Sequence, residues 1–333
     1  MRIIEGEHID SVLWLELVKQ SPVATWFQTK EAYMFFEDLS FLEAFAIAVE
    51  SEGQLKGLVA GYIQRDGGKI KQFFSRRAII VGGPLLSDEI TDEELAFLLS
   101  ALVKKLKKKA IFIETRNFND YNRWRPVFEQ LGFGYEPHYD VQVDTTSMES
   151  VNNKLDRNRR RNIKKALDNG VVIDENPSAD DLRQLYSMLE ELYTTKVKTP
   201  LFPFEFFEKL RAISSSRFFV AKNAEGQLLG GLVCVALEQR AVYAWLACGD
   251  DFNYKSLSPS VMVNYAGVSC AAREGMPRFD FMGAGKPDDG GYGVRDFKLK
   301  FGGELVEFGR YVYVCNRLLF GIGQLAVKVL KNG

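Results

Sequence analysis

The sequence predicts a mixed α/β fold that is built from two similar halves. Its 333 residues are 46% hydrophobic and 26% charged, which suits about two globular domains with substantial cores. The segment Glu-Gly-Gln-Leu occurs at 52–55 and again at 225–228, each time between two apolar, strand-like segments. Strands that alternate with helices around these turns predict mixed sheets flanked by helices.

The first half is expected to contain a hairpin followed by alternating helices and strands. Its hairpin comprises residues 44–50 and 56–63. A helix is expected over 91–106, because acidic residues occupy its first turn and lysines its end, as the helix dipole prefers. A strand at 110–114 and a helix at about 121–131 complete this half.

The second half repeats this order. Strand-like residues 217–224 and 229–237 flank the second copy of the turn. A helix is then expected over 259–274 and a strand over 278–282. Two helical stretches precede the hairpin in both halves, so a tandem duplication is the economical interpretation.

The boundary between the halves is expected in the polar stretch 145–150, which gives domains 1–148 and 149–333. If the halves are copies of one fold, Leu55 and Leu228 should occupy equivalent strands of two superposable domains.

Charge and hydropathy exclude several function classes. The formal net charge is −1, so no global field draws the protein to nucleic acid or membrane, and any anion-binding surface must be local. No run of about 20 apolar residues is present, so no stable membrane insertion is expected. The first residues lack the pattern of a secretory signal, and we expect a cytoplasmic protein.

Metal and nucleophile chemistry are not expected from the residue types present. The chain has two histidines, His8 and His138, which leaves little for a metal site or a Ser-His-Asp triad. Its cysteines are scattered through apolar surroundings and are interpreted as reduced core residues. These are Cys234, Cys248, Cys270 and Cys315.

Three segments exceed what packing requires, and the first is 279–285. Alternation along a strand places Phe279 and Phe281 on one face and Asp280 on the other, near the carboxyl end of the strand. Ligands of α/β proteins bind at that end. The alternative is that Asp280 only bonds nearby loop amides.

The second segment is the glycine-rich stretch 289–304. Glycines allow a backbone to approach a ligand closely, and Arg295, Lys298 and Lys300 can bind carboxylate or phosphate oxygens. The alternative is a hairpin whose lysines alternate onto solvent. If the first interpretation holds, Asp280, Lys298 and Phe301 should border one concave site.

The third segment, 154–165, carries seven positive charges. A helix of this kind can follow the backbone of a polyanion. A solvated helix face is the alternative, and its apolar stripe is compatible with both.

These motifs together resemble the FemA/FemB/FemX peptidyltransferase family. The strongest match is 279–283 (Phe-Asp-Phe-Met-Gly) followed by 297–304 (Phe-Lys-Leu-Lys-Phe-Gly-Gly-Glu), which is similar to the family signature DF-x-G … FK-x-x-FGG. Supporting matches lie at 27–29, 157–171 and 192–196. The resemblance implies two tandem GNAT-like acyltransferase domains. No heptad run supplies the coiled-coil arm of some members, so the compact, armless form is the nearer model.

The resemblance also implies an activity and roles for particular residues. Family members transfer an amino acid from aminoacyl-tRNA to the amine of a nucleotide- or lipid-linked peptidoglycan precursor. Lys298 would contact the donor or the oxyanion of the intermediate, with Asp280 as the second catalytic candidate. The substrate-binding candidates are Arg295, Lys300, Phe301, Tyr292, Tyr243 and Lys196, and the tRNA-binding candidates are Arg157, Arg159, Arg160 and Lys164.

Two other functions stay open at this point. Attack of an amine on an ester needs only proximity and oxyanion stabilisation, so no cofactor is expected. The alternative is an acyl-CoA-dependent N-acetyltransferase, which needs a glycine-rich turn leading into a helix. The corresponding segments, 81–84 and 255–260, fit this poorly, because a further segment separates the first from its helix and the second has no glycine. A non-catalytic binding module of the same fold is the third possibility.

Overall fold

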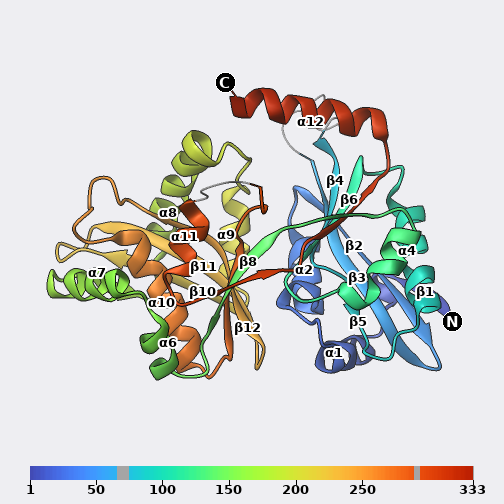
Figure 1. Cartoon of the computed structure of the whole chain (residues 1–333), viewed down its shortest axis with the longest axis horizontal. Helices are drawn as coiled ribbons and strands as arrows, with labels where there is room; N and C mark the ends of the chain where they lie inside the picture. The colour runs from blue at the N-terminus through green and yellow to red at the C-terminus, as the bar shows by residue number, and fades with distance from the viewer. Residues whose placement is uncertain (66–74, 289–292, 333) are drawn as a thin grey trace. The chain divides into compact units, whose positions relative to one another are not determined.

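The computed structural model describes residues 1–65, 75–288 and 293–332, and it divides into two compact units (Figure 1). The N-terminal unit comprises Met1–Pro137 and Phe308–Gly333, and the C-terminal unit comprises His138–Glu307. The chain therefore begins and ends in the same unit.

The N-terminal unit contains a mixed sheet in the order β1-β2-β3-β4-β6-β15-β7, with the short β5 beside β3. Its strands are β1 Arg2–Glu5, β2 Leu42–Ser51, β3 Gln54–Gln64, β4 Arg77–Gly82, β5 Leu85–Leu86, β6 Phe112–Asn117, β7 Gly134–Glu136 and β15 Arg310–Val314. Its helices are α1 Ser11–Gln20, α2 Lys30–Asp38, α4 Asp92–Leu106, α5 Arg125–Gln130 and α12 Arg317–Asn332, with short 3₁₀ turns at Gly6–His8, Trp26–Gln28 and Asn122–Trp124.

The C-terminal unit contains a second mixed sheet in the order β9-β10-β11-β12-β13-β8-β14. Its strands are β8 Tyr139–Asp144, β9 Val172–Asp174, β10 Ser216–Lys222, β11 Leu228–Leu237, β12 Ala241–Gly249, β13 Arg278–Gly283 and β14 Glu304–Glu307. Its helices are α6 Met148–Lys154, α7 Arg157–Asp168, α8 Ala179–Leu192, α9 Phe204–Arg211, α10 Pro259–Arg273 and α11 Gly293–Leu299, with a π-helical turn at Tyr193–Val197 after α8.

The two sheets repeat one topology, position by position. In each sheet the first four strands pair antiparallel, the fourth and fifth (β4–β6 and β12–β13) pair parallel, and the sixth and seventh pair antiparallel again. Leu55 lies on β3 and Leu228 on β11, the third strand of each sheet, so the predicted equivalence is confirmed. Two α-helices lie between the first and second strands of each sheet, α1 and α2 in one and α8 and α9 in the other, and α6 and α7 precede β9 in addition.

The units exchange one strand each. β8 follows β7 of the N-terminal unit in the chain, yet it pairs between β13 and β14 of the C-terminal sheet. β15, near the end of the chain, pairs between β6 and β7. The sequence-based domains 1–148 and 149–333 assign both strands to the other unit. No local signal marks such an exchange, because a strand has the same alternating pattern in either sheet.

The repeated turn is explained by its backbone geometry. Glu52 and Gly53 both have positive φ (53° and 75°), as the tightest hairpin turns require, and Gly226 has φ 81°. Glycine adopts this left-handed conformation without steric cost. The copies of Glu-Gly-Gln-Leu therefore mark a hairpin turn with a left-handed glycine at the same place in each half, although the two turns differ in type, because Glu52 has positive φ and Glu225 does not.

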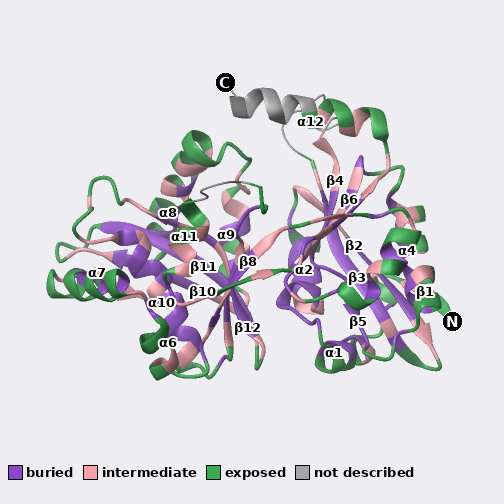
Figure 2. Ribbon diagram, viewed as in Figure 1, coloured by how far each residue is buried: buried purple, intermediate pink, exposed green. Residues whose placement is uncertain are grey.

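Each unit has its own apolar core between its sheet and its helices, and Figure 2 shows these faces buried. In the C-terminal unit, α10 lies in this core with eleven buried residues. Among the described residues, no helix is both long and apolar enough to cross a lipid bilayer.

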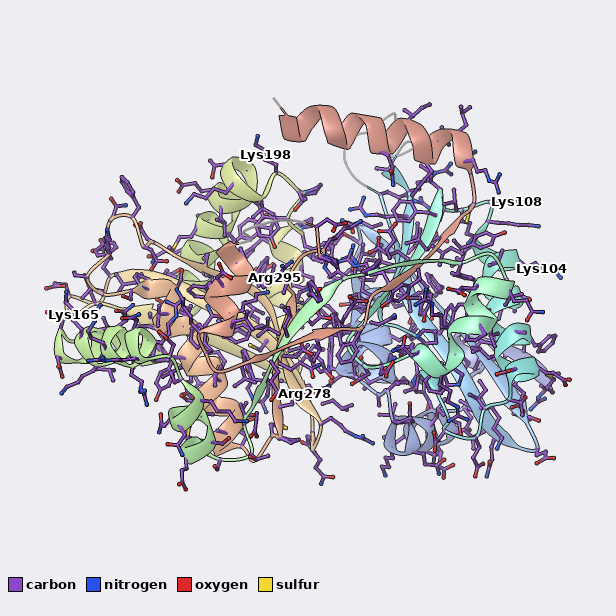
Figure 3. The ribbon with its side chains drawn as sticks, in the orientation of Figure 1. Lys104, Lys108, Lys165, Lys198, Arg278 and Arg295 are labelled. Atoms are coloured by element: carbon purple, nitrogen blue, oxygen red, sulfur yellow. The ribbon has the colours of Figure 1, made fainter. Side chains whose placement is uncertain are left out.

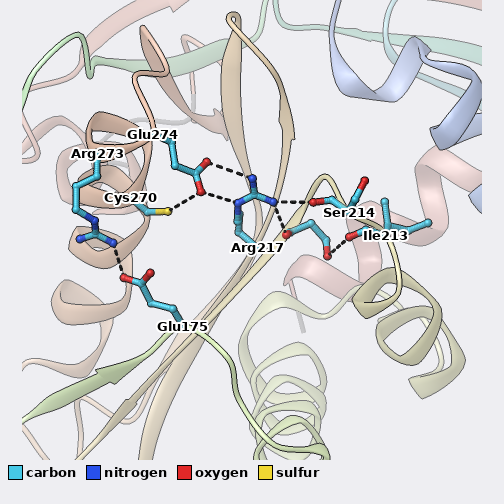
Figure 4. A network of polar contacts seen from close by, with 8 residues as sticks. Glu175, Ile213, Ser214, Arg217, Cys270, Arg273 and Glu274 are labelled. Atoms are coloured by element: carbon cyan, nitrogen blue, oxygen red, sulfur yellow. Dashed lines mark hydrogen bonds and ion pairs between the residues drawn. The ribbon is translucent and has the colours of Figure 1, made fainter.

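A polar network fixes the end of α10 (Figure 4). Arg217 on β10 donates from Nε to Oε1 of Glu274, just beyond the helix, at 2.9 Å, and the thiol of Cys270 donates to the same oxygen. Arg273 forms a further ion pair with Glu175. Burial raises the pKa of Cys270 to about 12, so this thiol stays protonated and is no nucleophile.

Candidate functional site

The parallel strands β12 and β13 diverge toward their carboxyl ends. They pair only at Val242↔Phe279 and Tyr243↔Asp280, although β12 continues to Gly249 and β13 to Gly283. In the N-terminal unit, the equivalent strands β4 and β6 pair at all six positions, from Arg77↔Phe112 to Gly82↔Asn117. Only the C-terminal sheet therefore has diverging strands at the place where α/β proteins bind ligands.

In the N-terminal unit, side chains fill the end of β4. Gln28 donates from Nε2 to the carbonyl oxygens of Gly82 (3.0 Å) and Gly83 (2.7 Å), and the hydroxyl of Tyr121 lies 2.6 Å from the carbonyl oxygen of Pro84. A Cβ on Gly83 would lie 2.7 Å from the Tyr121 ring. The space beside this glycine turn is therefore occupied by side chains of the protein itself.

Lys298, the predicted catalytic residue, lies at the carboxyl end of β13. Its Nζ donates to the carbonyl oxygens of Phe281 (2.8 Å), Met282 (3.2 Å) and Gly283 (2.8 Å). Met282 has φ 56°, and the pairing of β13 with β8 shifts register here, so that three successive carbonyls turn toward one ammonium. All three ammonium hydrogens therefore have an acceptor.

The hairpin expected for 289–304 is wrong for its described part. Gly293–Leu299 forms the helix α11, and Gly302, with φ 82°, follows its end. On a helix, Lys298 and Lys300 project in different directions, so Lys298 is half-buried and Lys300 is exposed. Tyr292 lies outside the described residues.

Two buried carboxylates accompany Lys298. Asp280 accepts hydrogen bonds from the amide of Met282 (2.7 Å) and from Nε2 of Gln142 (2.9 Å), and burial raises its pKa. Burial lowers the pKa of Lys298 to about 8, while the charges of Asp140 and Asp280 oppose this shift. The cluster therefore contains an amine that titrates close to neutral pH, which is typical of functional sites.

Aromatic rings connect β13 to α11. Phe279 and Phe281 lie on one face of β13 with centroids 4.9 Å apart, as the alternation predicted. Phe301 packs on Phe281 at 5.2 Å and on Phe297 at 5.4 Å. Phe301 is completely buried, so it belongs to the apolar packing that supports the site and has no surface to offer a ligand.

The other substrate-binding candidates fall into two groups. Arg295 on α11 (Figure 3) donates to the carbonyl oxygens of Ala284 and Lys286 and lies over the Tyr139 ring. Tyr243 is buried next to Arg278, and burial raises its pKa to about 12. In contrast, Lys196 and Lys300 are exposed and available to a ligand.

The basic segment forms the helix α7, as expected. Arg157, Arg160 and Lys164 are exposed, and Lys165 lies at the outer end of the helix in Figure 3. Arg159 is different, because it is buried on the inner face of α7 against α11. The expectation that Arg159 contacts tRNA beside the other three does not fit this placement.

The start of α10, next to the end of β12, is closed to anions. Pro259 has no amide hydrogen, and Val261 and Met262 donate to the carbonyl oxygen of Ser258. The remaining first-turn amide, that of Ser260, donates to the carboxylate of Asp251 at 3.1 Å. The usual anion-binding amides of a helix start are therefore all engaged.

Helix α4 of the N-terminal unit is equally unsuited to an anion. Thr91 and Glu94 form a reciprocal capping box at its start. Asp92, Glu93 and Glu94 place three carboxylates in the first turn, which would repel a phosphate.

A separate cavity of about 960 Å³ lies in the N-terminal unit along β1 and α4. It is lined by Ile4, His8, Phe97 and Lys104 among others, and it contains none of the predicted site residues. Lys105 on its wall is paired with Glu5.

Sequence reasoning missed Asp140 and Gln142, which lie in the exchanged strand β8. Val141 and Val143 face the apolar core, so alternation puts the polar residues on the opposite face with Asp280. That alternation was the available signal. The placement of β8 next to β13 was not readable from the sequence.

The fold and part of the sequence match known proteins. Residues 153–298, which make up most of the C-terminal unit, match the family model of the acetyltransferase (GNAT) domain. The structure is similar to the crystal structure of FemX, with a TM-score of 0.73 and 16% identity, over 97% of this chain and 99% of that one.

Two further solved structures are similar over nearly the whole chain. One is L-PGS from Bacillus licheniformis (TM-score 0.59, 14% identity, 96% of this chain and 98% of that one). The other is a tandem GNAT protein from the clavulanic acid biosynthesis pathway (TM-score 0.58, 11% identity, 95% of this chain and 99% of that one). No curated protein matches the chain by sequence. The tandem GNAT-like fold of the FemX type is thus established for this chain.

Proposed function

We propose that this tandem GNAT-fold chain is an aminoacyltransferase of the FemX type. Its donor would be an aminoacyl-tRNA, and its acceptor the amine of a nucleotide- or lipid-linked precursor of the cell envelope. The observation that carries the choice of donor is the engaged start of α10, where Asp251 already occupies the one amide left for a phosphate.

Coenzyme A would need a cradle of free amides for its pyrophosphate. Neither α10 nor α4 offers one among the described residues at its start. A tRNA donor does not need this cradle, because its phosphates are spread over a large surface. The exposed cations of α7 (Arg157, Arg160 and Lys164) are suited to such a backbone.

The reaction itself needs few groups. The neutral amine of the acceptor attacks the ester carbonyl, the ester C–O bond breaks, and the proton of the amine passes to the leaving hydroxyl of the tRNA. Lys298 would supply positive charge at the end of β13, where the carbonyl is expected to sit. To contact an oxyanion directly, its ammonium would give up one of its three carbonyl acceptors.

The acceptor class is supported by resemblance. The signature at 279–283 and 297–304 resembles a family that modifies peptidoglycan precursors. A further solved structure of similar fold belongs to a protein named as a lysylphosphatidylglycerol synthetase, which is named for joining lysine to a lipid. Both point to an amine or hydroxyl of an envelope component.

The experiment is a donor comparison with purified protein. Two donors are compared: mixed tRNA that is charged with radiolabelled amino acids, and labelled acetyl-CoA. Each donor is incubated with nucleotide-linked and with lipid-linked muropeptides. We expect label to reach a muropeptide from charged tRNA, and at least a hundredfold less from acetyl-CoA. Transfer from acetyl-CoA alone would establish an N-acetyltransferase instead. Binding of charged tRNA without transfer to any acceptor would indicate a non-catalytic module.

A further inference from the structure

Arg159 occupies a position on α7 that helical spacing assigns to an apolar residue. It shares one face with Ile163 and Ala166, all three are buried, and 91% of its surface is removed from solvent. Burying a guanidinium is costly unless it finds partners. The residues that meet Arg159 should therefore show why a cation is kept there.

Its partners are all on or beside α11. Nη2 donates to the carbonyl oxygen of Phe297 at 3.3 Å, and the guanidinium lies 4.2 Å from the centre of the Phe297 ring and 5.3 Å from that of Phe301. Among the described residues no carboxylate lies within ion-pair distance of Arg159. Asp156 and Asp251 act on it only from farther away, and its Nε has no acceptor.

The carbonyl of Phe297 is one that α11 leaves without a helical partner. The amide that would bond it, that of Phe301, donates to Lys298 O at 3.0 Å instead, as the helix tightens and ends. A cation at a helix carboxyl end also interacts favourably with the helix dipole. Arg159 thus caps α11 and stacks on the aromatic rings that flank Lys298.

We propose that Arg159 is a positioning residue, which holds the end of α11 so that Lys298 reaches the three carbonyls at the end of β13. It does not touch the reacting atoms. The two faces of α7 then have different functions. Its exposed arginines bind the donor, and its buried Arg159 holds α11. The consequence for turnover rests on the proposed function, whereas the consequence for Lys298 does not.

The first test needs no activity. The rate at which Lys298 is acetylated by dilute acetic anhydride is followed against pH by mass spectrometry in the parent protein, Arg159→Met, Arg159→Lys and Arg160→Met. When Arg159 no longer holds α11, Lys298 becomes more exposed. The loss of desolvation, which is the largest cause of its lowered pKa, then raises that pKa from about 8. A rise of one unit lowers the neutral fraction at pH 8 from about one half to about one tenth, an effect of about fivefold.

The expected result is a shift of the Lys298 titration in Arg159→Met, partial return in Arg159→Lys, and none in Arg160→Met. An unchanged titration in Arg159→Met that is folded by circular dichroism would overturn the proposal. If Arg159→Met does not fold, the same comparison is made with Arg159→Lys, which keeps the charge but lacks the planar stacking group.

The second test separates this inference from the proposed function. In a transfer assay, Arg159→Met should lower kcat about tenfold or more with little change in the KM for charged tRNA, whereas Arg160→Met should mainly raise that KM. A shift of the Lys298 titration in Arg159→Met, together with no turnover by the parent, would support the positioning role of Arg159 and refute the proposed function. Normal kcat in Arg159→Met with an active parent would refute the positioning role.

Discussion

Replacing Lys298 by methionine should remove a pH dependence from the stability of the protein. The pKa of Lys298 falls from an ordinary 10.5 to about 8 on folding, so the unfolded chain binds more protons between these values. Stability contributed by this residue therefore rises with pH across that window and is lowest below pH 8. From these two pKa values, Lys298 alone should add about 2 kcal/mol to the free energy of unfolding between pH 7.5 and 9.5. The cysteines, whose pKa burial raises, contribute in the opposite direction as pH approaches and passes their ordinary pKa of 9, so the contribution of Lys298 is measured as the difference between the parent and Lys298→Met.

The assay is urea unfolding at pH 7.5 and 9.5, compared among the parent, Lys298→Met and Lys300→Met. Lys300 is exposed and has the same charge two residues away, so it controls for the general effect of losing a lysine. Between these two pH values, the change in the free energy of unfolding should be about 2 kcal/mol less favourable in Lys298→Met than in the parent, and the same as in the parent in Lys300→Met. The same pH dependence in all three proteins would refute the assignment of a desolvated, weakly basic amine to Lys298.

Three further predictions test the surroundings of the site. Asp251→Ala should lower stability by about 1 kcal/mol, as the loss of a helix-start acceptor does, and an unchanged urea midpoint would contradict the closed start of α10. Arg160→Ala should weaken tRNA binding and reduce the slope of log K against log salt by about 1, and an unaltered slope would exclude a phosphate contact there. Gly302→Ala should destabilise by at least about 1–3 kcal/mol, because φ is 82° and the new Cβ would lie 2.6 Å from Lys154 O. The control is Gly321→Ala, because a Cβ at Gly321 meets nothing within 4 Å. Equal melting temperatures of Gly302→Ala and Gly321→Ala would contradict the predicted strain at Gly302.

Local sequence signals were enough to predict the duplication and the approximate bounds of several helices and strands. The segment Glu-Gly-Gln-Leu at 52–55, repeated at 225–228, identified the duplication, and its glycines Gly53 and Gly226 both have positive φ in turns between paired strands. The helices α4 and α10 and the strand β13 begin and end within a few residues of the expected places. Caps, helix-end glycines and apolar periods are properties of neighbouring residues, so the sequence contains them.

The site was less accessible to sequence reasoning, since it depends on contacts between distant segments. Lys298 and Asp280 came from the resemblance, but the sequence could not show that β8 brings Gln142 to Asp280, 138 residues apart. Arg159 stood in a run of seven cations, and nothing in the run distinguishes the buried one except its register with Ile163. The alternation of Lys298 and Lys300 suggested a strand, whereas Gly293–Leu299 forms the helix α11.

The most direct test of the account is single-turnover transfer from charged tRNA by the parent, Lys298→Met and Lys300→Met, each shown to be folded. In the proposed mechanism the reacting carbonyl lies at the end of β13 next to the charge of Lys298, and loss of such a contact typically costs on the order of 10²–10³ in rate. We therefore expect a fall of that size in Lys298→Met and a rate within about threefold of the parent in Lys300→Met. Near-normal transfer by folded Lys298→Met, in an assay where the parent is active, would contradict the account.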